Sequence, residues 1–361
     1  MAKLFEAITV RGLEVRNRIW VPPMCEYSCE NRDGVPTDWH VVHLGSMAIG
    51  GAGLIIAEAT AILPEGRISP WCTGIYNDEQ VEAWSRVTKF VHSQGAKIAL
   101  QLAHAGRKAS THREQSGTGS VSLADGGWQS VSSTSEAFDG YDAPRELETH
   151  EIPTLVQAWA AAAARSIAAG FDAVEVHAAH GYLLHQFLSP LTNRRSDEYG
   201  GSLENRAKFL LDVVAAIRQV IPNEAPIFVR FSATDYADGG VTPEEIATVA
   251  RWCADLGADL FDISTGGLVT GVKIPTGPGY QVSYAETIAE KVGQPVSAVG
   301  QITSALQAEQ ILEDGQIAVV MIGRQSMRDP HFALRAAHEL GVEIDYWPVQ
   351  YQRARWPKEV V

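Results

Sequence analysis

The sequence has 361 residues, of which 45% are hydrophobic and 20% are charged, and this balance is typical of a folded protein with a large core. The formal net charge of −14 opposes binding to a nucleic-acid backbone or to an anionic membrane surface. No apolar run is long enough to span a bilayer, and the N-terminus lacks the apolar core and cleavage site of a signal peptide. The four cysteines are too few and too scattered for a disulfide scaffold, so we expect a reduced, soluble, cytoplasmic protein.

The chain opens with a weakly alternating stretch, residues 1–18, whose Arg11-Gly12 pair predicts a hairpin that could plug the bottom of a barrel. After it, short apolar runs alternate with helical patterns. The runs predict strands at residues 19–21, 53–57, 97–102, 173–177, 227–231, 260–264, 296–299 and 319–322. The helical patterns cover residues 39–49, 78–95, 155–169, 202–220, 284–292 and 329–340, and further helices begin near residues 242 and 303.

Local signals mark several of these boundaries. Asp38 and Asp78 are the expected caps of the first two helices, and Thr242-Pro-Glu-Glu245 combines a cap, an N1 proline and a capping-box glutamate. Eight strands, each followed by a helix and apolar on both faces, form the (β/α)8 TIM-barrel pattern of the α/β class. A doubly wound sheet is the competing hypothesis, but the sequence has no Gly-x-Gly-x-x-Gly dinucleotide motif. We therefore expect one TIM-barrel domain over residues 1–361.

Two segments depart from the repeating pattern. Residues 105–151, after the third barrel strand, are rich in Gly, Ser and Thr without periodicity, and loops this long are usually functional or disordered. Because this segment leaves the C-terminal end of a strand, where barrel enzymes carry their sites, we expect it to form a lid over the barrel mouth. The tail, residues 345–361, is rich in Trp, Tyr and Arg and is too aromatic for a plain solvated end.

The residues with the clearest chemical character end the stretch Asp172-Ala-Val-Glu-Val-His-Ala-Ala-His-Gly-Tyr182, which passes from a buried strand to His177, His180 and Tyr182. Two imidazole N–H donors can hold a developing oxyanion, and a phenol can donate a proton. A His-x-x-His pair can also bind a metal, but no third ligand stands at a suitable spacing, so we expect no metal site. Either histidine alone could be an ordinary hydrogen-bonded residue, and only the cluster argues for function.

A phosphate site is predicted after the last two strands. Gly300 and Gly323 follow the seventh and eighth strands, where TIM-barrel loops commonly hold a phosphate with backbone N–H groups, and Arg324 adds a cation. Gly323-Arg324 alone could instead be a barrel turn with a surface salt bridge. With both glycine positions together, the barrel mouth is expected to bind a phosphorylated ligand.

Five longer motifs stand in the chain: NRIWVPPMCEYS, GGAGLIIAEATAILPEGRIS, LQLAHAGRKA, VEVHAAHGYLLHQFLSPLTNRRSDEYGGSLENR and VVMIGRQSMRDP. Together they resemble the old yellow enzymes, FMN-dependent NAD(P)H ene-reductases, in their thermophilic-like subgroup. The resemblance runs from about Leu4 to Trp356, nearly the whole chain. It implies bound FMN, reduced by NADPH or NADH in a ping-pong cycle. The implied substrates are activated alkenes, such as α,β-unsaturated carbonyl and nitro compounds among xenobiotics.

The resemblance also implies roles for individual residues. Flavin-binding positions are matched by Pro23, Met24, Cys25, Ala59, Gln101 and Arg230, and phosphate-binding positions by Gly300, Gly323 and Arg324. Within this set Cys25 would tune the redox potential of the flavin, and Arg230 would stabilise the anionic reduced form. Considered without its neighbours, Cys25 would more often be a small buried hydrophobe.

For the substrate, the resemblance assigns His177 and His180 to the carbonyl or nitro oxygen. Tyr182 would donate the proton to the alkene, and Tyr27 would be a second phenol lining the pocket. The two donors would then stabilise the negative charge that develops on the oxygen when hydride arrives at the other end of the conjugated system.

The C-terminal Gln350-Tyr-Gln-Arg-Ala-Arg-Trp356 resembles the segment of this subgroup whose arginine enters the active site of a neighbouring subunit. Alignment on Gln-Tyr-x-Arg matches Arg353 to that arginine. Arg355 is the alternative, because the spacing to the tryptophan is longer here than is usual. The resemblance therefore implies a homodimer or homotetramer with shared active sites.

Two other functions remain open from the residues alone. A phosphate-binding aldolase or isomerase barrel would need a Schiff-base lysine or a carboxylate base at a strand end, but Lys97 and Lys273 are poorly placed and no such carboxylate stands out. A flavin-carrying or small-molecule-binding protein with a vestigial site is the non-enzymatic hypothesis.

Overall fold

The computed structural model describes residues 2–357, so the end of the predicted tail segment, residues 358–361, lies outside the described residues. Within residues 2–357, eight parallel strands close into a barrel in the order β3-β4-β5-β8-β9-β10-β11-β12, and β12 pairs back to β3. The strands are β3 (Ile19–Val21), β4 (Leu54–Ala61), β5 (Lys97–Ala103), β8 (Ala173–Ala178), β9 (Ile227–Ser232), β10 (Leu260–Ser264), β11 (Val296–Ala298) and β12 (Val319–Met321). This closed parallel barrel confirms the predicted TIM-barrel fold.

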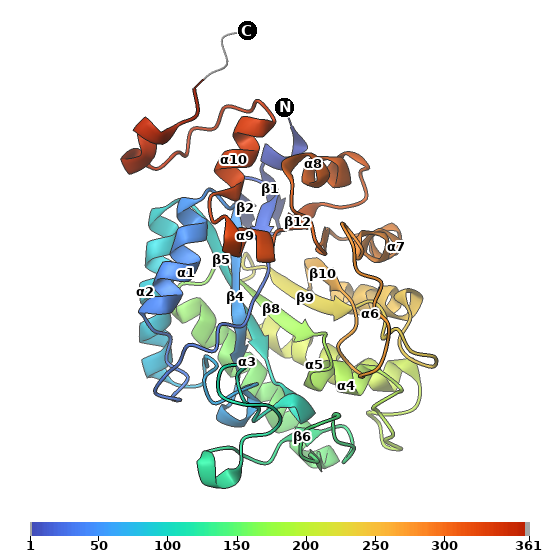
Figure 1. Ribbon diagram of the computed structural model, residues 1–361. Helices are drawn as coiled ribbons and strands as arrows, with labels where there is room; N and C mark the ends of the chain where they lie inside the picture. The colour runs from blue at the N-terminus through green and yellow to red at the C-terminus, as the bar shows by residue number, and fades with distance from the viewer. Residues whose placement is uncertain (1, 358–361) are drawn as a thin grey trace.

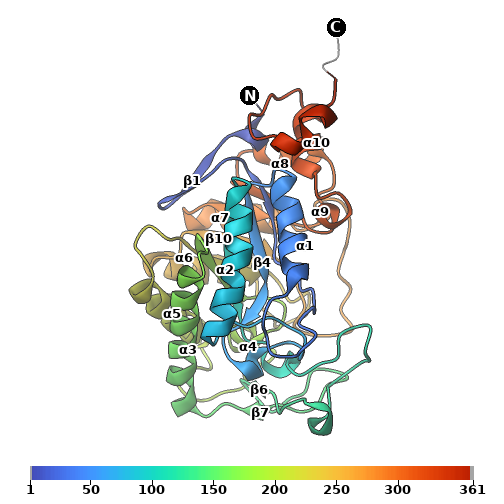
Figure 2. The same ribbon diagram turned by 90° about the vertical axis from the view of Figure 1, so that its left-hand side faces the viewer.

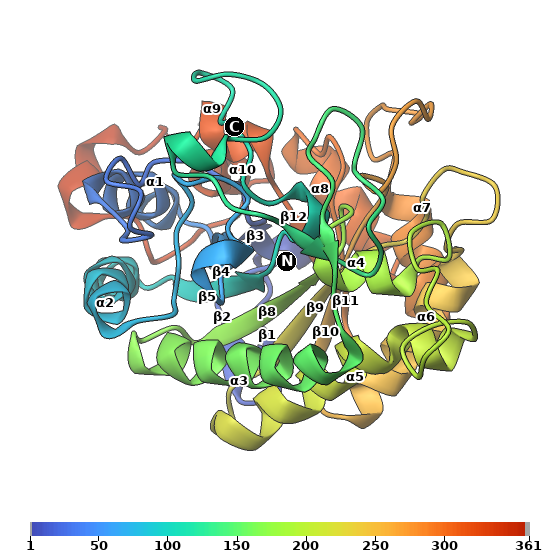
Figure 3. The same cartoon turned by 90° about the horizontal axis from the view of Figure 1, so that it is seen from below.

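Helices pack around the outside of the barrel, as Figure 3 shows along the barrel axis. The principal helices are α1 (Asp38–Ile49), α2 (Asp78–Ser93), α3 (Ile152–Ala168), α5 (Leu203–Val220), α6 (Pro243–Asp255), α7 (Val282–Val292), α8 (Ala305–Glu313) and α10 (Phe332–Glu339). The short helices α4 (Leu183–Leu188) and α9 (Arg324–Arg328) were not predicted from the sequence. Both begin directly behind predicted site residues, so the chain turns into a helix as soon as it has placed those side chains.

Two predicted helix caps are wrong by one residue. Thr37 and Asn77 are the N-caps of α1 and α2, and the Asn77 side chain accepts from the backbone N–H of Gln80 at 2.9 Å. Asp38 and Asp78 are instead the first helical residues, where a carboxylate is favoured by the positive end of the helix dipole. The capping box predicted at Thr242 is confirmed at the start of α6.

The N-terminal hairpin closes one end of the barrel. Strands β1 (Ile8–Val10) and β2 (Leu13–Val15) pair antiparallel around Arg11, which has a positive φ of 52°. Their buried side chains join the core inside the barrel, where the rings of Trp20 and Phe228 lie 5.6 Å apart. In Figure 1 this hairpin lies at the upper end of the barrel, on the same side as α10. The predicted hairpin plug is therefore present.

The 105–151 segment lies at the opposite end of the molecule, below the barrel in Figures 1 and 2. It contains two short paired strands, β6 (Val131–Ser132) and β7 (Arg145–Glu146). Three 3-10 turns complete it, η3 (Gly106–Lys108), η4 (Leu123–Asp125) and η5 (Thr149–Glu151). Residues 114–118 and 122–126 are exposed, whereas the first part of the segment, residues 105–111, is almost wholly buried. Its function as a lid stays a prediction.

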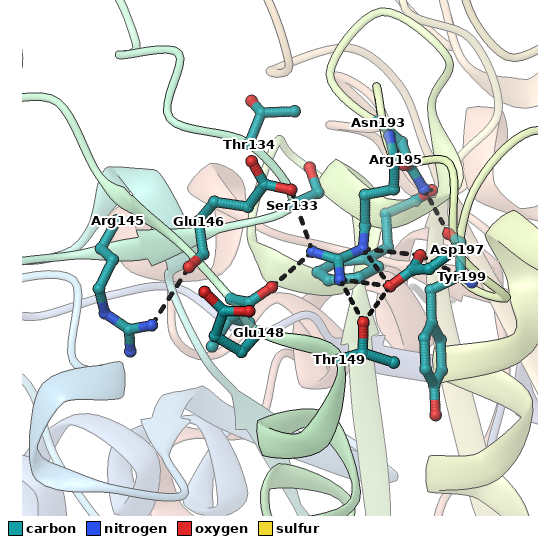
Figure 4. Close-up of polar contacts among 12 residues, drawn as sticks. Ser133, Thr134, Arg145, Glu146, Glu148, Thr149, Asn193, Arg195, Asp197 and Tyr199 are labelled. Atoms are coloured by element: carbon teal, nitrogen blue, oxygen red, sulfur yellow. Dashed lines mark hydrogen bonds and ion pairs between the residues drawn. The ribbon is translucent and has the colours of Figure 1, made fainter.

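A buried arginine fixes the returning end of this segment. The Arg195 side chain, 5% exposed, donates to the carbonyl oxygen of Leu147 at 2.6 Å and to the Thr149 hydroxyl at 3.2 Å. Figure 4 shows the guanidinium group between Thr149 and Asp197, whose carboxylate lies 3.0 Å from Nε. The segment is thus tied to the loop after α4. None of the helices within residues 2–357 has the length and apolar character needed to cross a bilayer.

Candidate active site

A strained turn at the end of β8 carries the predicted catalytic residues. His180 has a φ of 57° and Gly181 a φ of 73°, in the left-handed region that is unfavourable for a residue with a side chain. Two backbone N–H groups of the turn donate to side chains outside it and hold it in place. The N–H of His180 donates to the Ser232 hydroxyl at 3.0 Å, and the N–H of Gly181 donates to Nδ1 of His185 at 3.0 Å. Such over-determined strain is characteristic of functional sites.

This turn brings the three side chains into contact. The ring of His177 lies edge-on to the ring of His180 at 5.2 Å and to the ring of Tyr182 at 4.9 Å between centroids. The three predicted catalytic residues therefore form one cluster, although His177 belongs to β8 and Tyr182 already caps α4.

Hydrogen bonds indicate which imidazole nitrogen of His177 carries the proton. Nδ1 of His177 accepts from the backbone N–H of Ala179 at 3.2 Å, so Nε2 holds the hydrogen and is free to donate. The Ser264 hydroxyl oxygen accepts from the Gln281 side-chain amide at 3.1 Å and lies 2.8 Å from Nε2 of His180. The Ser264 contact fits either tautomer of His180, because a hydroxyl oxygen can accept two hydrogen bonds. Where the hydroxyl donates to Nε2, Nδ1 of His180 carries the hydrogen. His177 therefore offers one N–H group, and His180 offers a second when the Ser264 hydroxyl donates to it.

Burial sets the protonation state of the cluster. It lowers the pKa of His177 and of His180 well below the usual value, and the nearby guanidinium group of Arg230 lowers both further. Burial also raises the pKa of the Tyr182 phenol well above its usual value, with the Cys25 thiol as the next cause. At neutral pH the site therefore holds two neutral imidazole donors beside a protonated phenol.

A cavity of about 450 Å³ opens beside this cluster at the C-terminal end of the strands. It is lined by six of the predicted cofactor residues, Pro23, Met24, Arg230, Gly300, Gly323 and Arg324. Ser264 also lines it and so connects the cavity to His180. Arg328, which the sequence prediction missed, adds another cation to the wall. Within residues 2–357 Arg324 and Arg328 form no ion pair, so both charges are available to an anionic ligand.

The remaining predicted flavin contacts lie in two adjoining places. Cys25 and Ala59 share an apolar cluster with Tyr27 and Tyr182, so the two predicted phenols are brought together. Burial, and then the nearby carboxyl group of Glu58, raises the pKa of Cys25 to about 12. The sulfur is therefore kept as a thiol. The Tyr27 backbone has a φ of 52°, another strained residue at this rim.

Gln101 lies inside the barrel in a polar layer that the sequence prediction missed. Its side-chain amide donates to Glu175 at 2.7 Å, and the guanidinium Nε of Arg230 lies 3.0 Å from a carboxylate oxygen of Asp262. Burial, and then repulsion from Asp262, raises the pKa of Glu175 to about 8. Ser297 donates to the other oxygen of Asp262 at 2.8 Å. The signal in the sequence was one charged residue, Glu175, Arg230 or Asp262, inside each of the otherwise apolar strands β8, β9 and β10.

Two predicted residues lie away from this cluster. Arg353 is exposed in η6 (Val349–Ala354), in the tail beyond α10. In Figure 1, α10 lies at the hairpin end of the barrel. Arg353 cannot reach the site of its own chain. Arg355 lies over the ring of Trp347 at 5.6 Å. Within the described chain, no group of three His, Cys, Asp or Glu side chains is arranged to hold a metal ion.

The comparison with known proteins shows which chemistry this arrangement belongs to. Residues 3–343 match the sequence profile of the NADH:flavin oxidoreductase / NADH oxidase family. The chain belongs to this family. It is therefore an FMN-dependent oxidoreductase that uses a reduced nicotinamide as co-substrate. This assignment sets aside the aldolase or isomerase hypothesis.

Individual relatives agree with the resemblance to the old yellow enzymes. An NADPH dehydrogenase of Bacillus subtilis (strain 168) is 45% identical over 352 residues, which are 97% of this chain and 98% of that protein. The structure of morphinone reductase in complex with tetrahydroNAD is 30% identical with a TM-score of 0.78, over 95% of this chain and 92% of that one. An old yellow enzyme homologue from Zymomonas mobilis is 30% identical with a TM-score of 0.77, over 98% of each chain.

The residues of the cavity fit FMN. Arg324 and Arg328 supply unpaired cations for its phosphate, and Arg230, paired with Asp262, adds a guanidinium group at the inner wall. Two glycines leave the backbone open to a ligand. A Cβ atom at Gly323 would lie 3.3 Å from Pro22, and one at Gly300, whose φ is 121°, would lie 3.1 Å from Gln281.

Proposed function

We propose that the protein reduces activated C=C bonds, in α,β-unsaturated carbonyl or nitro compounds, with hydride from NADPH or NADH. When bound, FMN supplies the hydride chemistry that connects the nicotinamide to the alkene. The observation that carries the proposal is the cluster of His177, His180 and Tyr182, in which two neutral N–H donors stand beside a buried, protonated phenol.

Each member of the cluster has a separate part. Nε2 of His177 would donate to the carbonyl or nitro oxygen of the substrate, and so would Nδ1 of His180 in the tautomer whose Nε2 accepts from Ser264. Together they would stabilise the negative charge that develops there. Tyr182 gives its phenolic proton to the alkene carbon next to the activating group. Tyr27, in the same apolar cluster as Tyr182, excludes water from one wall of the pocket.

The cofactor side of the proposal uses the residues of the cavity. Gly300, Gly323 and Arg324 would hold the phosphate, with Arg328 as an additional cation. Arg230 is fixed by its ion pair with Asp262 and would stabilise the extra negative charge of the reduced ring. Pro23, Met24, Cys25, Ala59 and Gln101 would surround the ring system.

The purified protein tests the proposal directly. We expect a yellow protein whose flavin absorbance is bleached by NADPH under anaerobic conditions and restored by 2-cyclohexenone. A cinnamate ester, whose double bond is less activated, serves as the matched poor substrate. Bleaching without recovery by any enone or nitroalkene would contradict the reductase and leave a flavin-carrying protein.

We further propose that two or four chains share their active sites through the tail. Arg353 is exposed and forms no ion pair within the described residues, whereas Arg355 is occupied against Trp347, which favours Arg353 as the residue that reaches a neighbour. Arg353→Ala should weaken the affinity for enone and NADPH, and Arg355→Ala is the matched control. Full affinity in the Arg353→Ala protein, or a monomer in sedimentation experiments, would count against shared sites.

A further inference from the structure

Lys108 stands at the start of the 105–151 segment and reaches into the catalytic turn. Its Nζ donates to the carbonyl oxygen of His180 at 2.9 Å and to that of Gly267 in the loop after β10. The same ammonium group lies 4.3 Å from the ring centroid of Phe138 and 5.6 Å from that of Tyr182. One lysine therefore touches the backbone of an oxygen-binding residue and faces the ring of the proposed proton donor.

The two loops that it joins are already in close backbone contact. A Cβ atom at Gly267 would lie 2.7 Å from Cα of His180, and one at Gly181 would lie 2.4 Å from the carbonyl oxygen of Gly267. The carbonyl groups of His180 and Gly267 both accept from Nζ of Lys108 and therefore point toward the same position. Without a cation between them, two negative dipole ends would face each other without a donor. Lys108 satisfies both and so holds the left-handed conformation of His180 in place.

We propose that Lys108 is a positioning residue of the site, which locks the His180 turn onto the β10 loop and places a positive charge beside Tyr182. The inference rests on the proposed function. In the protonation step the phenolic O–H bond of Tyr182 breaks, its proton forms a C–H bond at the alkene carbon, and a phenolate remains until solvent reprotonates it. A nearby ammonium group stabilises that phenolate, which the apolar surroundings of Tyr182 otherwise disfavour.

The neighbouring residue Arg107 makes different contacts, so its substitution is a control for that of Lys108. Its guanidinium group donates to the carbonyl oxygen of Leu268 at 2.8 Å and, at 3.4 Å, to that of Glu136 in the 105–151 segment. No hydrogen bond joins Arg107 to His180 or Tyr182 within the described residues. Arg107 therefore anchors the segment, whereas Lys108 also contacts the catalytic turn.

The charge on Lys108 titrates within an accessible range. The charged and titratable groups around it are Arg107 on its own turn, His177, His180 and Tyr182 from the β8 side, and Glu136 beyond Arg107. Burial, and then Arg107, lowers the pKa of Lys108 to about 8. The ammonium group is therefore present below pH 8, and its effect is lost as the pH rises through that value. Tyr182 does not titrate there, because its own pKa is raised.

The test compares Lys108→Met, Lys108→Arg and Arg107→Met with the natural protein in both half-reactions. For the natural protein, we expect the rate of re-oxidation by 2-cyclohexenone to fall as the pH rises above 8. Lys108→Met should re-oxidise about tenfold more slowly at pH 7 and lose this fall. Lys108→Arg should keep most of the rate and stay flat to higher pH, since a guanidinium remains charged. FMN content and reduction by NADPH should be unchanged in all variants.

Hydrogen exchange at residues 179–182 gives a second readout that does not depend on turnover. Exchange should be faster in Lys108→Met and unchanged in Arg107→Met, because of these two side chains only that of Lys108 is hydrogen-bonded to the turn. If the natural protein is not re-oxidised by any enone, the proposed function fails, and this exchange result still decides the positioning role. The inference would be overturned if Lys108→Met had the same hydrogen exchange at residues 179–182 and the same pH dependence of re-oxidation as the natural protein. So would equal losses in Lys108→Met and Arg107→Met, since both lysine and arginine would then act only as anchors.

Discussion

Replacing Tyr182 with phenylalanine separates the chemistry of the site from its construction. The Tyr182 hydroxyl forms no hydrogen bond to another residue within 2–357, so its removal leaves no buried partner unsatisfied. The ring would keep its edge-on contact with His177 at 4.9 Å. Tyr182→Phe should therefore change the free energy of unfolding by less than about 1 kcal/mol.

The same substitution should strongly slow one half-reaction. A positioned general acid contributes about 10²–10⁴-fold to a rate, which corresponds to about 2.7–5.5 kcal/mol of barrier. Stopped-flow measurements of flavin absorbance would follow reduction by NADPH and re-oxidation by 2-cyclohexenone separately. We expect reduction to be nearly unchanged and re-oxidation to slow by that factor. An equal loss in both steps, or a loss of bound FMN, would refute the assignment and make Tyr182 a structural residue.

Three further changes probe the surroundings of the site. Arg230→Met should destabilise the chain by about 3–5 kcal/mol in urea unfolding, because it leaves the buried carboxylate of Asp262 unpaired, and Arg230→Lys should restore part of the loss. Gly267→Ala should raise the KM for enones, since its Cβ would press on His180 and its φ of 89° favours glycine; an unchanged KM would contradict this contact. Glu175 has a folded pKa raised to about 8, so the stability that it contributes is complete below about pH 4.5 and lost as the pH rises through 8. Glu175→Gln should flatten this dependence in unfolding experiments at several pH values.

The barrel was predictable because its strands are short apolar runs between helices with clear caps. The clearest length error was β4, predicted to end at residue 57 but continuing to Ala61. The continuation contains Glu58, whose charge breaks the apolar run. In the structure this carboxylate is buried against Nε2 of His40 at 3.0 Å. A partner 18 residues away removes the cost of burial, and local sequence patterns do not reveal that partner.

The site residues also divide into those that the sequence predicts and those that only the structure reveals. His177, His180 and Tyr182 lie within six residues of one another, so their grouping could be seen in the chain. Lys108 could not be placed, because its partners are backbone carbonyl groups from two distant loops that carry no signature in the sequence. Residue roles that came from the resemblance alone, such as redox tuning by Cys25, stay predictions.

The double anchoring of the 105–151 segment has a consequence for how its sequence can vary. Lys108 and Arg107 fasten its first turn, and Arg195 fastens its return at Leu147 and Thr149. The stretches between these points, residues 114–118 and 122–126, are exposed and bury little surface against the rest of the fold. A flexible loop of twice the length costs only about 0.6 kcal/mol more to close. Evolution or engineering can therefore vary these two exposed stretches while the turn that carries His180 keeps its geometry.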